Sequence, residues 1–159
     1  MLDCEASPVL PTVRLVEPGE IDRNELLALY ESVGWTAYLR NPDDVVQAIA
    51  GSHRIAAAFD DSAPSLSAGA GRLVGTARTI SDGVTVCYLL NVVVHPNYQR
   101  RGLGRAMIEL LWAEYPPERL RLRVLVTDAE PRQRAFYESL GLTEAHDNNP
   151  PLRCFAKLT

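Results

Sequence analysis

The fold is decided by residues 89–112, which read LLNVVVHPNYQRRGLGRAMIELLW. The first six of these residues are rich in β-branched side chains and predict a buried strand. The strand is expected to end at His95-Pro96, because proline has no N–H to donate to a sheet and restricts the residue before it to extended backbone. From Leu103 onward the apolar residues recur at helical spacing, which predicts an amphipathic helix.

Residues 99–105 join the predicted strand to the predicted helix, and we call them the phosphate loop. Their sequence, QRRGLGR, combines two glycines with three arginines. Glycine lets a ligand approach the backbone, and the first N–H groups of a helix have no intrahelical partner and favour an anion. Arginine adds charge-assisted contacts to phosphate. The loop therefore predicts a pyrophosphate site, formed by Gln99, Arg100, Arg101, Gly102, Leu103, Gly104 and Arg105.

Two common phosphate-binding motifs do not match this loop. A dinucleotide-binding loop would place its third glycine at position 107, which is Met107. An NTP-binding loop would place Lys and then Ser or Thr after the last glycine, and Arg105-Ala106 stands there instead. The remaining pattern is Q-x-x-G-x-G at the start of a helix, after a strand that ends in V-x-P.

This pattern resembles motif A of the GCN5-related N-acetyltransferases, which bind the pyrophosphate of coenzyme A. Residues 134–142, RAFYESLGL, resemble the F-Y-x-x-x-G-F element of the same family, with Leu142 in place of the last Phe. Residues 73–83 and the segment around Trp35 are similar to a subgroup that includes plant serotonin acetyltransferase-like enzymes.

The rest of the chain predicts one α/β (α+β) domain over residues 13–159, behind a flexible tail at residues 1–12. The resemblance implies a single mixed, mostly antiparallel sheet flanked by about four helices, the acyl-CoA N-acyltransferase fold. Besides the central strand and helix, helices are expected at 20–33, 41–51 and from 131 to 140, and strands at 13–16, 53–59, 73–80, 119–127, 142–145 and 152–158.

Composition sets the outer limits of function. The chain has 159 residues. None of its apolar runs approaches the length of about 20 residues that a membrane-spanning helix needs. A formal net charge of −4 argues against nucleic-acid binding. The three cysteines are far apart, so no metal site is expected. The first residues lack the pattern of a secretory signal, and we expect a cytoplasmic protein.

The resemblance implies acetyl-CoA as cofactor and assigns several site residues. Main-chain groups of Val92, Val93 and Val94 would pair with the pantetheine arm, and an N–H of Val93 or Val94 would polarise the thioester carbonyl. Tyr137 would act as the general acid for the leaving thiolate. The family often has Asn seven residues before this tyrosine, where this chain has Glu130. Arg132 or Gln133 could supply that contact to the coenzyme, or the contact is absent.

The amine acceptor must lose a proton before it attacks. Related enzymes often carry an acid where this chain has Asn91, which cannot accept a proton at neutral pH. His95, Asp82 and Glu31 are weaker candidates for the base, and we favour ordered water. The aromatic residues expected to line an amine pocket, unless they only pack the core, are Tyr30, Trp35 and Tyr38.

The sequence therefore predicts an N-acetyltransferase that moves the acetyl group of acetyl-CoA to a primary amine, by direct attack in a ternary complex. The amine belongs to a small molecule or to a peptide or protein. The alternatives are a non-catalytic acyl-CoA-binding sensor or scaffold and, against the motif evidence, a nucleotide-binding protein. The acceptor, the acyl-chain preference and the oligomeric state are left open, although homodimers are common among related enzymes.

Overall fold

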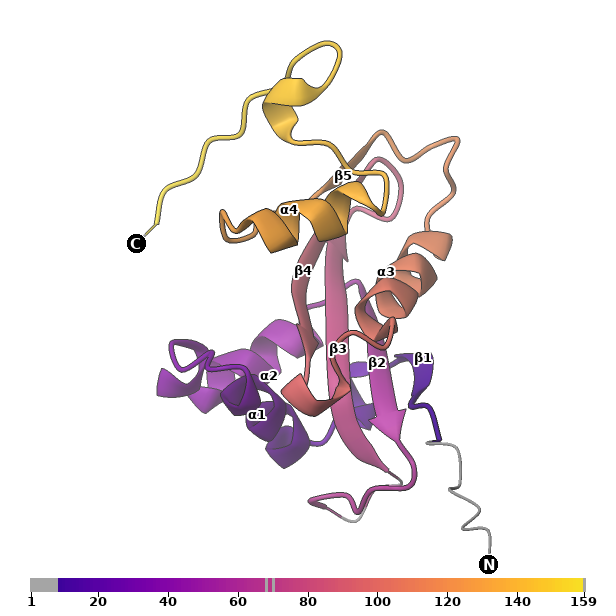
Figure 1. Cartoon of the computed structure of the whole chain (residues 1–159), viewed down its shortest axis with the longest axis vertical. Coiled ribbons are helices and arrows are strands. Elements are labelled where there is room, and N and C mark those ends of the chain that lie inside the picture. Colours follow the sequence, from indigo (N-terminus) through magenta and orange to yellow (C-terminus); the bar gives the residue numbers. More distant parts are fainter. Residues whose placement is uncertain (1–8, 68, 70, 159) are drawn as a thin grey trace, which may run out of the picture. The chain divides into compact units, whose positions relative to one another are not determined.

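The computed structural model describes residues 9–67, 69 and 71–158, and the chain divides into two compact units, residues 1–125 and 126–159. The first unit contains a sheet in the order β1-β2-β3-β4-β5 (Figure 1). Four strands run antiparallel to their neighbours and β5 runs parallel to β4, which confirms the predicted mixed sheet. The strands are β1 Thr12–Val16, β2 Arg54–Asp60, β3 Arg72–Ser81, β4 Val86–Val94 and β5 Leu122–Val124.

Helices cover both faces of this sheet. Successive side chains of a strand point to opposite faces. On β2, Ala57 belongs to the core beneath α1 (Arg23–Ser32) and α2 (Pro42–Ala50), whereas Ala58 lies at Gly75 close to Met107 of α3 (Leu103–Ala113). In Figure 1, α1 and α2 accordingly lie on one side of the sheet and α3 on the other. Short 3-10 turns are η1 Pro18–Glu20, η2 Tyr38–Arg40 and η3 Pro96–Tyr98.

The predicted helix over residues 20–33 is divided between η1 and α1. Asp22 caps α1, because its side chain accepts hydrogen bonds from the backbone N–H groups of Asn24 and Glu25. Glu25 lies three residues after Asp22, the spacing at which a capping box would bond the glutamate side chain back to the N-cap N–H, but this bond is not formed. The carboxylate of Glu25 is buried and accepts from Ser65 Oγ and the N–H of Leu73 instead, so it ties the 61–71 loop to α1.

The second unit contains α4 (Pro131–Glu138) and the 3-10 turn η4 (Ala145–Asp147). Gly141 follows α4 with φ 84°, a backbone conformation that glycine adopts without strain, so the predicted helix stop is confirmed. The strands expected at 142–145 and 152–158 are wrong. Phe155 and Leu158 are 88% and 97% exposed, so these side chains have no buried surface to stabilise a strand.

Strand β5 is shorter than the predicted strand over residues 119–127. Leu120, which precedes β5 in the sequence, is buried, whereas Val126, which follows β5, is 58% exposed. Only Leu122, Arg123 and Val124 pair with β4. The short strand has a direct consequence for β4, because its residues 89–94 extend beyond the last residue of β5.

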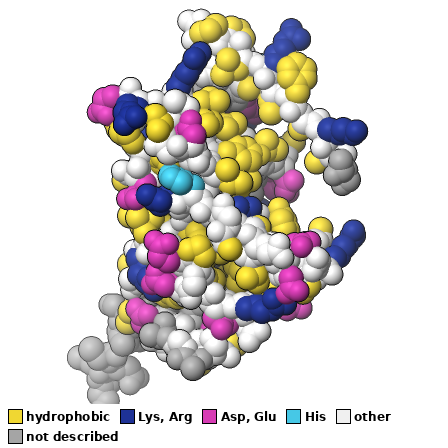
Figure 2. All heavy atoms as spheres, turned by 180° about the vertical axis from the view of Figure 1, so that it is seen from behind, with side chains coloured by type: hydrophobic (Ala, Val, Ile, Leu, Met, Phe, Trp, Pro, Cys, Tyr) yellow, Lys and Arg dark blue, Asp and Glu magenta, His cyan; other side chains and the backbone are white. Residues whose placement is uncertain are grey.

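No helix of the described residues is both long and apolar enough to cross a membrane. On the face shown in Figure 2, the described acidic and basic side chains are interspersed, without a broad area of a single sign. The described residues of this face therefore form no basic stripe of the kind that is typical of nucleic-acid-binding proteins.

Gly75 lies where α3 comes closest to the sheet. A Cβ atom there would lie 3.1 Å from Met107 Cε and 3.2 Å from the carbonyl oxygen of Val93. The methionine end can move, but the Val93 carbonyl belongs to the central strand and cannot move without disturbing the sheet. Glycine at this position therefore allows the close approach of α3 to β3.

We expect Gly75→Ala to lower the free energy of unfolding by about 1–3 kcal/mol, because overpacking a dense core forces backbone shifts. Urea denaturation measures this change. Gly51→Ala is the matched control, since a Cβ there would meet no atom closer than 3.5 Å. Equal midpoints for the two variants would contradict the packing argument.

Candidate active site

The central strand β4 is irregular where the site begins. Its pairing with β3 passes from Val93 opposite Thr76 to Leu90 opposite Arg78, which leaves Asn91 and Val92 in a bulge. Asn91 has φ 48°, a conformation that asparagine tolerates better than most residues. Bulges redirect side chains and interrupt pairing. Asn91 is thereby turned out of the ladder.

The edge of β4 beyond β5 is the stretch proposed for the pantetheine arm. β5 pairs with β4 only at Val86, Cys87 and Tyr88, so within the described part of the sheet no strand pairs with residues 89–94 on that side. An unpaired strand edge offers backbone N–H and C=O groups to an extended ligand. Val93 itself is 2% exposed and anchors the strand in the core. The contacts predicted for Val92, Val93 and Val94 remain predictions.

The turn between β4 and the phosphate loop is held by side chains. His95 Nδ1 accepts from the N–H of Asn97 at 3.2 Å, and Gln99 Nε2 donates to the carbonyl of Val94 at 2.9 Å. Arg101 Nη2 donates to the carbonyl of Asn97 at 2.9 Å. Burial, assisted by the nearby charge of Arg72, lowers the pKa of His95. His95 and Gln99 thus have structural partners within the turn.

Asp60 anchors this turn to β2, a role that sequence reasoning missed. Its carboxylate is 8% exposed and accepts from Tyr98 Oη at 2.6 Å and from Ser62. The hydrogen bonds from Ser62 and Tyr98 lower the pKa of Asp60, and the bond to Asp60 raises the pKa of Tyr98. The Tyr98 ring in turn lies 5.2 Å from the guanidinium of Arg101, a cation–π distance.

The phosphate loop ends in the geometry of an anion site. Gly102 is the N-cap of α3 with φ 81°, and Arg100 has φ 64°. This positive φ favours glycine at position 102, and no protein atom would lie within 4 Å of a Cβ there. The first intrahelical bond runs from Ala106 N to Gly102 O, and helix geometry leaves the preceding N–H groups directed outward.

Arginines surround this helix start. Arg100 and Arg101 are exposed, and Arg105 contacts Glu109 at 3.4 Å. An outward-facing helix N-terminus beside two exposed guanidinium groups fits a diphosphate. The neighbouring open edge of β4 fits an amide-bearing chain. The residues present therefore fit coenzyme A, and the close approach of the ligand predicted at Gly102 remains a prediction.

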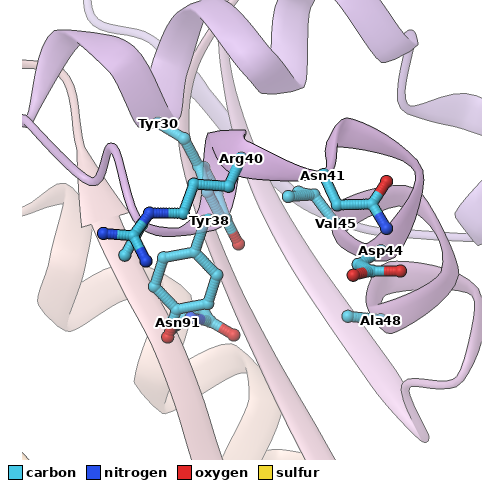
Figure 3. Close-up of a pocket in the computed structure, with 9 residues that line it drawn as sticks. Tyr30, Tyr38, Arg40, Asn41, Asp44, Val45, Ala48 and Asn91 are labelled. Atoms are coloured by element: carbon cyan, nitrogen blue, oxygen red, sulfur yellow. Dashed lines mark hydrogen bonds between the residues drawn. The ribbon is translucent and has the colours of Figure 1, made fainter.

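A pocket of about 310 Å³ lies beside the bulge, between η2, α1, α2 and β4 (Figure 3). Tyr30 and Tyr38 line it, and their predicted role in binding an amine remains a prediction. Trp35 does not line it; its ring packs 5.2 Å from that of Tyr30 and 5.5 Å from that of Tyr38, because the segment turns it toward the core. The polar lining residues that sequence reasoning missed as pocket residues are Arg40, Asn41, Asp44 and Asn91.

Behind the pocket, Arg78 holds Asn91 in place. Arg78 is 9% exposed, and its Nε donates to Asn91 Oδ1 at 2.7 Å. Its Nη1 donates to the carbonyl of Ala48 at 3.2 Å. Asn91 Nδ2 donates in turn to Tyr38 Oη at 3.1 Å. No described carboxylate forms an ion pair with Arg78, and burial lowers the pKa of this guanidinium.

Tyr30 lies at the bottom of the same pocket with a protected phenol. It is 2% exposed, and burial raises its pKa to about 12. Above its ordinary value of 10.0, an unfolded Tyr30 loses its proton while the folded residue keeps it. Stability from this group is thus complete below pH 10.0 and is lost as the pH rises toward about 12.

We expect the free energy of unfolding to fall by about 1–3 kcal/mol over that range because of Tyr30 alone. Urea denaturation at successive pH values measures the slope. Tyr30→Phe keeps the ring and should give a flatter slope than the parent protein. Identical slopes for the two proteins would show that Tyr30 is not the responsible group.

The second unit carries the predicted general acid. Tyr137 lies on α4 with its ring 5.1 Å from that of Phe136, and burial raises its pKa. A raised pKa keeps the phenol protonated at neutral pH, as a proton donor requires. At the start of α4, Glu130 is the N-cap and pairs with Arg132 at 3.7 Å. The coenzyme contact suggested for Arg132 or Gln133 remains a prediction.

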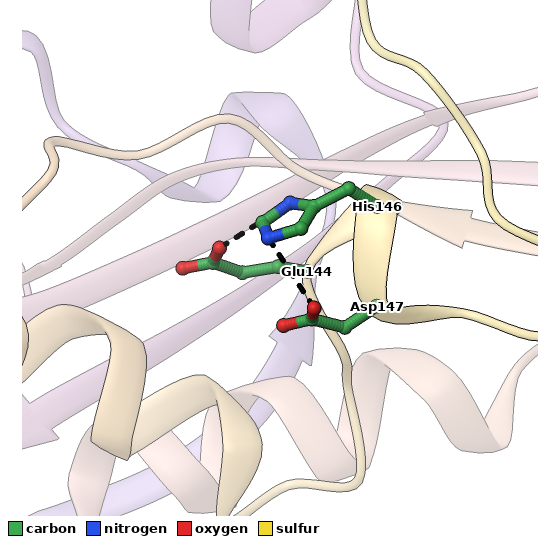
Figure 4. Close-up of side chains that lie close together, drawn as sticks. All are labelled: Glu144, His146 and Asp147. Atoms are coloured by element: carbon green, nitrogen blue, oxygen red, sulfur yellow. Dashed lines mark ion pairs between the residues drawn. The ribbon is translucent and has the colours of Figure 1, made fainter.

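Glu144, His146 and Asp147 form the one candidate metal cluster among the described residues (Figure 4). All three are exposed. Arg134 pairs with Glu144 and with Asp147, at 3.3 Å in each case. The guanidinium also pairs with Glu138, so its single positive charge offsets part of the negative charge of three carboxylates, and the cluster is explained as a surface ion-pair network.

An open strand edge, an arginine-flanked helix N-terminus and an adjoining polar pocket are combined here with the acyl-CoA N-acyltransferase fold. The family model for an acetyltransferase (GNAT) domain matches residues 51–144, more than half of the chain. The chain belongs to the GCN5-related N-acetyltransferase family.

Several members of the family, both characterised and uncharacterised, are similar to this chain in sequence. The chain is 43% identical over 77 residues to serotonin N-acetyltransferase 2 of Oryza sativa, covering 48% of this chain and 38% of that protein. It is 32% identical over 126 residues to a histone acetyltransferase of Glycine max, and the alignment covers 77% of this chain and 52% of that protein. An uncharacterised N-acetyltransferase of Porphyra purpurea is 30% identical over 138 residues, covering 87% and 74%. The chain thus spans only part of the first two relatives.

Solved structures show the same fold. An acetyltransferase of the GNAT family from Streptococcus pneumoniae matches with a TM-score of 0.70 at 23% identity, covering 94% of this chain and 97% of that one. Glucosamine-6-phosphate N-acetyltransferase from Arabidopsis thaliana matches with a TM-score of 0.61 at 14% identity, covering 93% and 97%. Both similarities concern the fold alone.

Proposed function

We propose that this protein transfers the acetyl group of acetyl-CoA to a primary amine by direct attack in a ternary complex. One observation carries the proposal. Asn91 belongs to the open part of β4 and also lines the pocket, so the strand proposed for the coenzyme and the pocket proposed for the acceptor meet at one residue. An acceptor in the pocket would therefore lie next to the strand along which the thioester is expected.

The residues have distinct roles in this proposal. The N–H groups at the start of α3, with Arg100 and Arg101, hold the diphosphate. Acetyl-CoA supplies the acetyl group as a reactive thioester. A backbone N–H of Val93 or Val94 donates to the oxygen on which negative charge develops. Tyr137 keeps a proton on its phenol for the departing sulfur.

Deprotonation of the amine is assigned to ordered water. His95 Nδ1 is engaged with the N–H of Asn97, and Asn91 lacks a basic group. Glu31 and Asp82 are not among the residues that line the pocket. The carboxylate of Asp82 accepts from Thr85 and from the N–H of Val84, which lowers its pKa and makes it a poor base.

The acceptor is a small-molecule amine or a peptide amine. Among the relatives, the rice protein is named for serotonin, the soybean protein for histone, and an Escherichia coli protein, 45% identical over 60 residues, for an alanine of ribosomal protein bS18. That alignment covers 36% of this chain and 39% of the E. coli protein. A cytoplasmic location and a homodimer stay predictions.

Thiol release from acetyl-CoA over a panel of amines tests the proposal. The panel holds arylalkylamines, polyamines, amino acids, aminoglycosides and lysine peptides, and mass spectrometry identifies the acetylated product. Amine-dependent thiol release with an N-acetylated product is the expected result. Tight binding of acetyl-CoA without acetylation of any amine would instead support the sensor alternative.

A further inference from the structure

The pocket contains a chain of hydrogen bonds with a fixed direction. Arginine can only donate hydrogen bonds, so the oxygen of the Asn91 amide must face Arg78 and the NH₂ group must face Tyr38. Tyr38 Oη therefore receives a hydrogen bond from Asn91, and its own proton is left for another acceptor. Among the described residues, no group accepts that proton.

The same side of the pocket carries positive charge. Arg78 is buried behind Asn91 without a carboxylate partner, although a buried charge is costly unless it is paired. Arg40 lines the pocket next to Tyr38 in Figure 3, and no described residue forms an ion pair with it. The Arg40 guanidinium and the Tyr38 hydroxyl thus lie on one side of the pocket. Arg78 lies behind them and orients the hydroxyl through Asn91.

The opposite side of the pocket is negative. Asp44 lies on α2, with its carboxylate away from Arg40 in Figure 3, and forms no ion pair with a described residue. A plain amine would pair with Asp44 but would use neither the Tyr38 hydroxyl proton nor the Arg40 guanidinium, both of which belong to exposed residues that line the pocket. A molecule with both an amino group and a carboxylate is complementary to both sides.

We propose that the acceptor is an amino acid or another small amine that carries a carboxylate. The carboxylate accepts hydrogen bonds from the Tyr38 hydroxyl and the Arg40 guanidinium. Asp44 attracts the cationic form of the molecule into the pocket, and the amine, once it has lost its proton, attacks at the Asn91 end, where the thioester is expected. Arg78 acts as a positioning residue, because it orients Asn91 and thereby the Tyr38 hydroxyl. This inference rests on the proposed function and narrows its acceptor class.

Matched pairs of ligands test the inference. Tryptophan with tryptamine, tyrosine with tyramine and lysine with cadaverine differ only in the carboxylate. Binding of each is measured by calorimetry on the wild-type protein saturated with coenzyme A, and acetylation is measured with acetyl-CoA. For at least one pair we expect the acid to bind and react about 10–100-fold better, as a charge-assisted hydrogen bond contributes about 1.5–3 kcal/mol.

Two variants assign the preference to the pocket. Tyr38→Phe and Arg40→Gln should each reduce affinity for the acid about tenfold more than affinity for the decarboxylated amine. Arg121→Gln, an exposed arginine outside the pocket, should change neither.

The outcomes separate this inference from the proposed function. Acetylation of amines without a carboxylate preference would overturn the inference and keep the function. Binding of neither member of any pair, or equal losses for both members in Tyr38→Phe and Arg40→Gln, would also overturn it. Binding of acids without acetylation of any amine would keep the pocket assignment and contradict the transferase function.

Discussion

Tyr137→Phe is expected to lower kcat for acetyl transfer by about 100-fold or more, because general acid catalysis contributes about 10²–10⁴. The phenol is half-buried and burial raises its pKa, so it retains the proton that the leaving thiolate needs. Phenylalanine keeps the ring and its packing against Phe136. The affinity for acetyl-CoA and the thermal stability should therefore change little. Steady-state kinetics with saturating acetyl-CoA measures the effect.

Tyr115→Phe is the matched control for this prediction. Tyr115 Oη bonds to Thr79 Oγ1 at 2.6 Å and to His53 Nδ1 at 2.8 Å, beyond the C-terminal end of α3. Its loss should lower stability by about 1–2 kcal/mol and leave kcat unchanged. A Tyr137→Phe enzyme with the parent kcat would remove Tyr137 from the mechanism.

Gly102→Ala is expected to weaken binding of coenzyme A by about 10–100-fold. The φ of 81° at this residue is unfavourable for a residue with a Cβ, by about 1–2 kcal/mol. Relaxation of that strain would rotate the first N–H groups of α3 away from the diphosphate and lose charge-assisted hydrogen bonds. Isothermal titration with coenzyme A measures the affinity.

Gly83→Ala controls for backbone strain without touching the site. Gly83 has φ 78°, and a Cβ there would lie 3.5 Å from His53 Nε2, an ordinary contact. Both variants should lose similar stability, and only Gly102→Ala should lose affinity. Equal affinities for the two variants would exclude the start of α3 as the diphosphate site.

Local sequence signals predicted the elements that position the site. The run of β-branched residues before Pro96 gave β4, and the glycine-rich loop before an amphipathic pattern gave α3. Gly34 and Gly141 directly follow the helices predicted to end at residues 33 and 140, and both have positive φ. These features depend on the residue itself and its neighbours, so one sequence suffices to find them.

The acceptor pocket could not be predicted in the same way. Its polar residues come from η2, α2 and β4, and Arg78 reaches them from β3. No spacing along the chain connects Arg40 or Asp44 with Asn91, because tertiary folding alone brings them together. The positive φ of Asn91 gave no signal either, since it results from the bulge between two particular strands.

The C-terminal strands failed for a related reason. Residues 152–158 alternate in a way that is compatible with a strand, but a strand needs a partner and a buried face. Phe155 is 88% exposed, so the apolar positions are not buried there. An alternating hydrophobic pattern therefore predicted a strand correctly only where a neighbouring strand of the sheet can pair with it.

The most direct test of the account is a titration of isotope-labelled protein with coenzyme A, followed by the backbone amide resonances. The account predicts that the largest shifts fall on residues 92–94 and on residues 99–105, and that a bound acceptor then shifts Asn91 and Tyr38. Saturable binding that leaves the amides of β4 and the phosphate loop unchanged would contradict it.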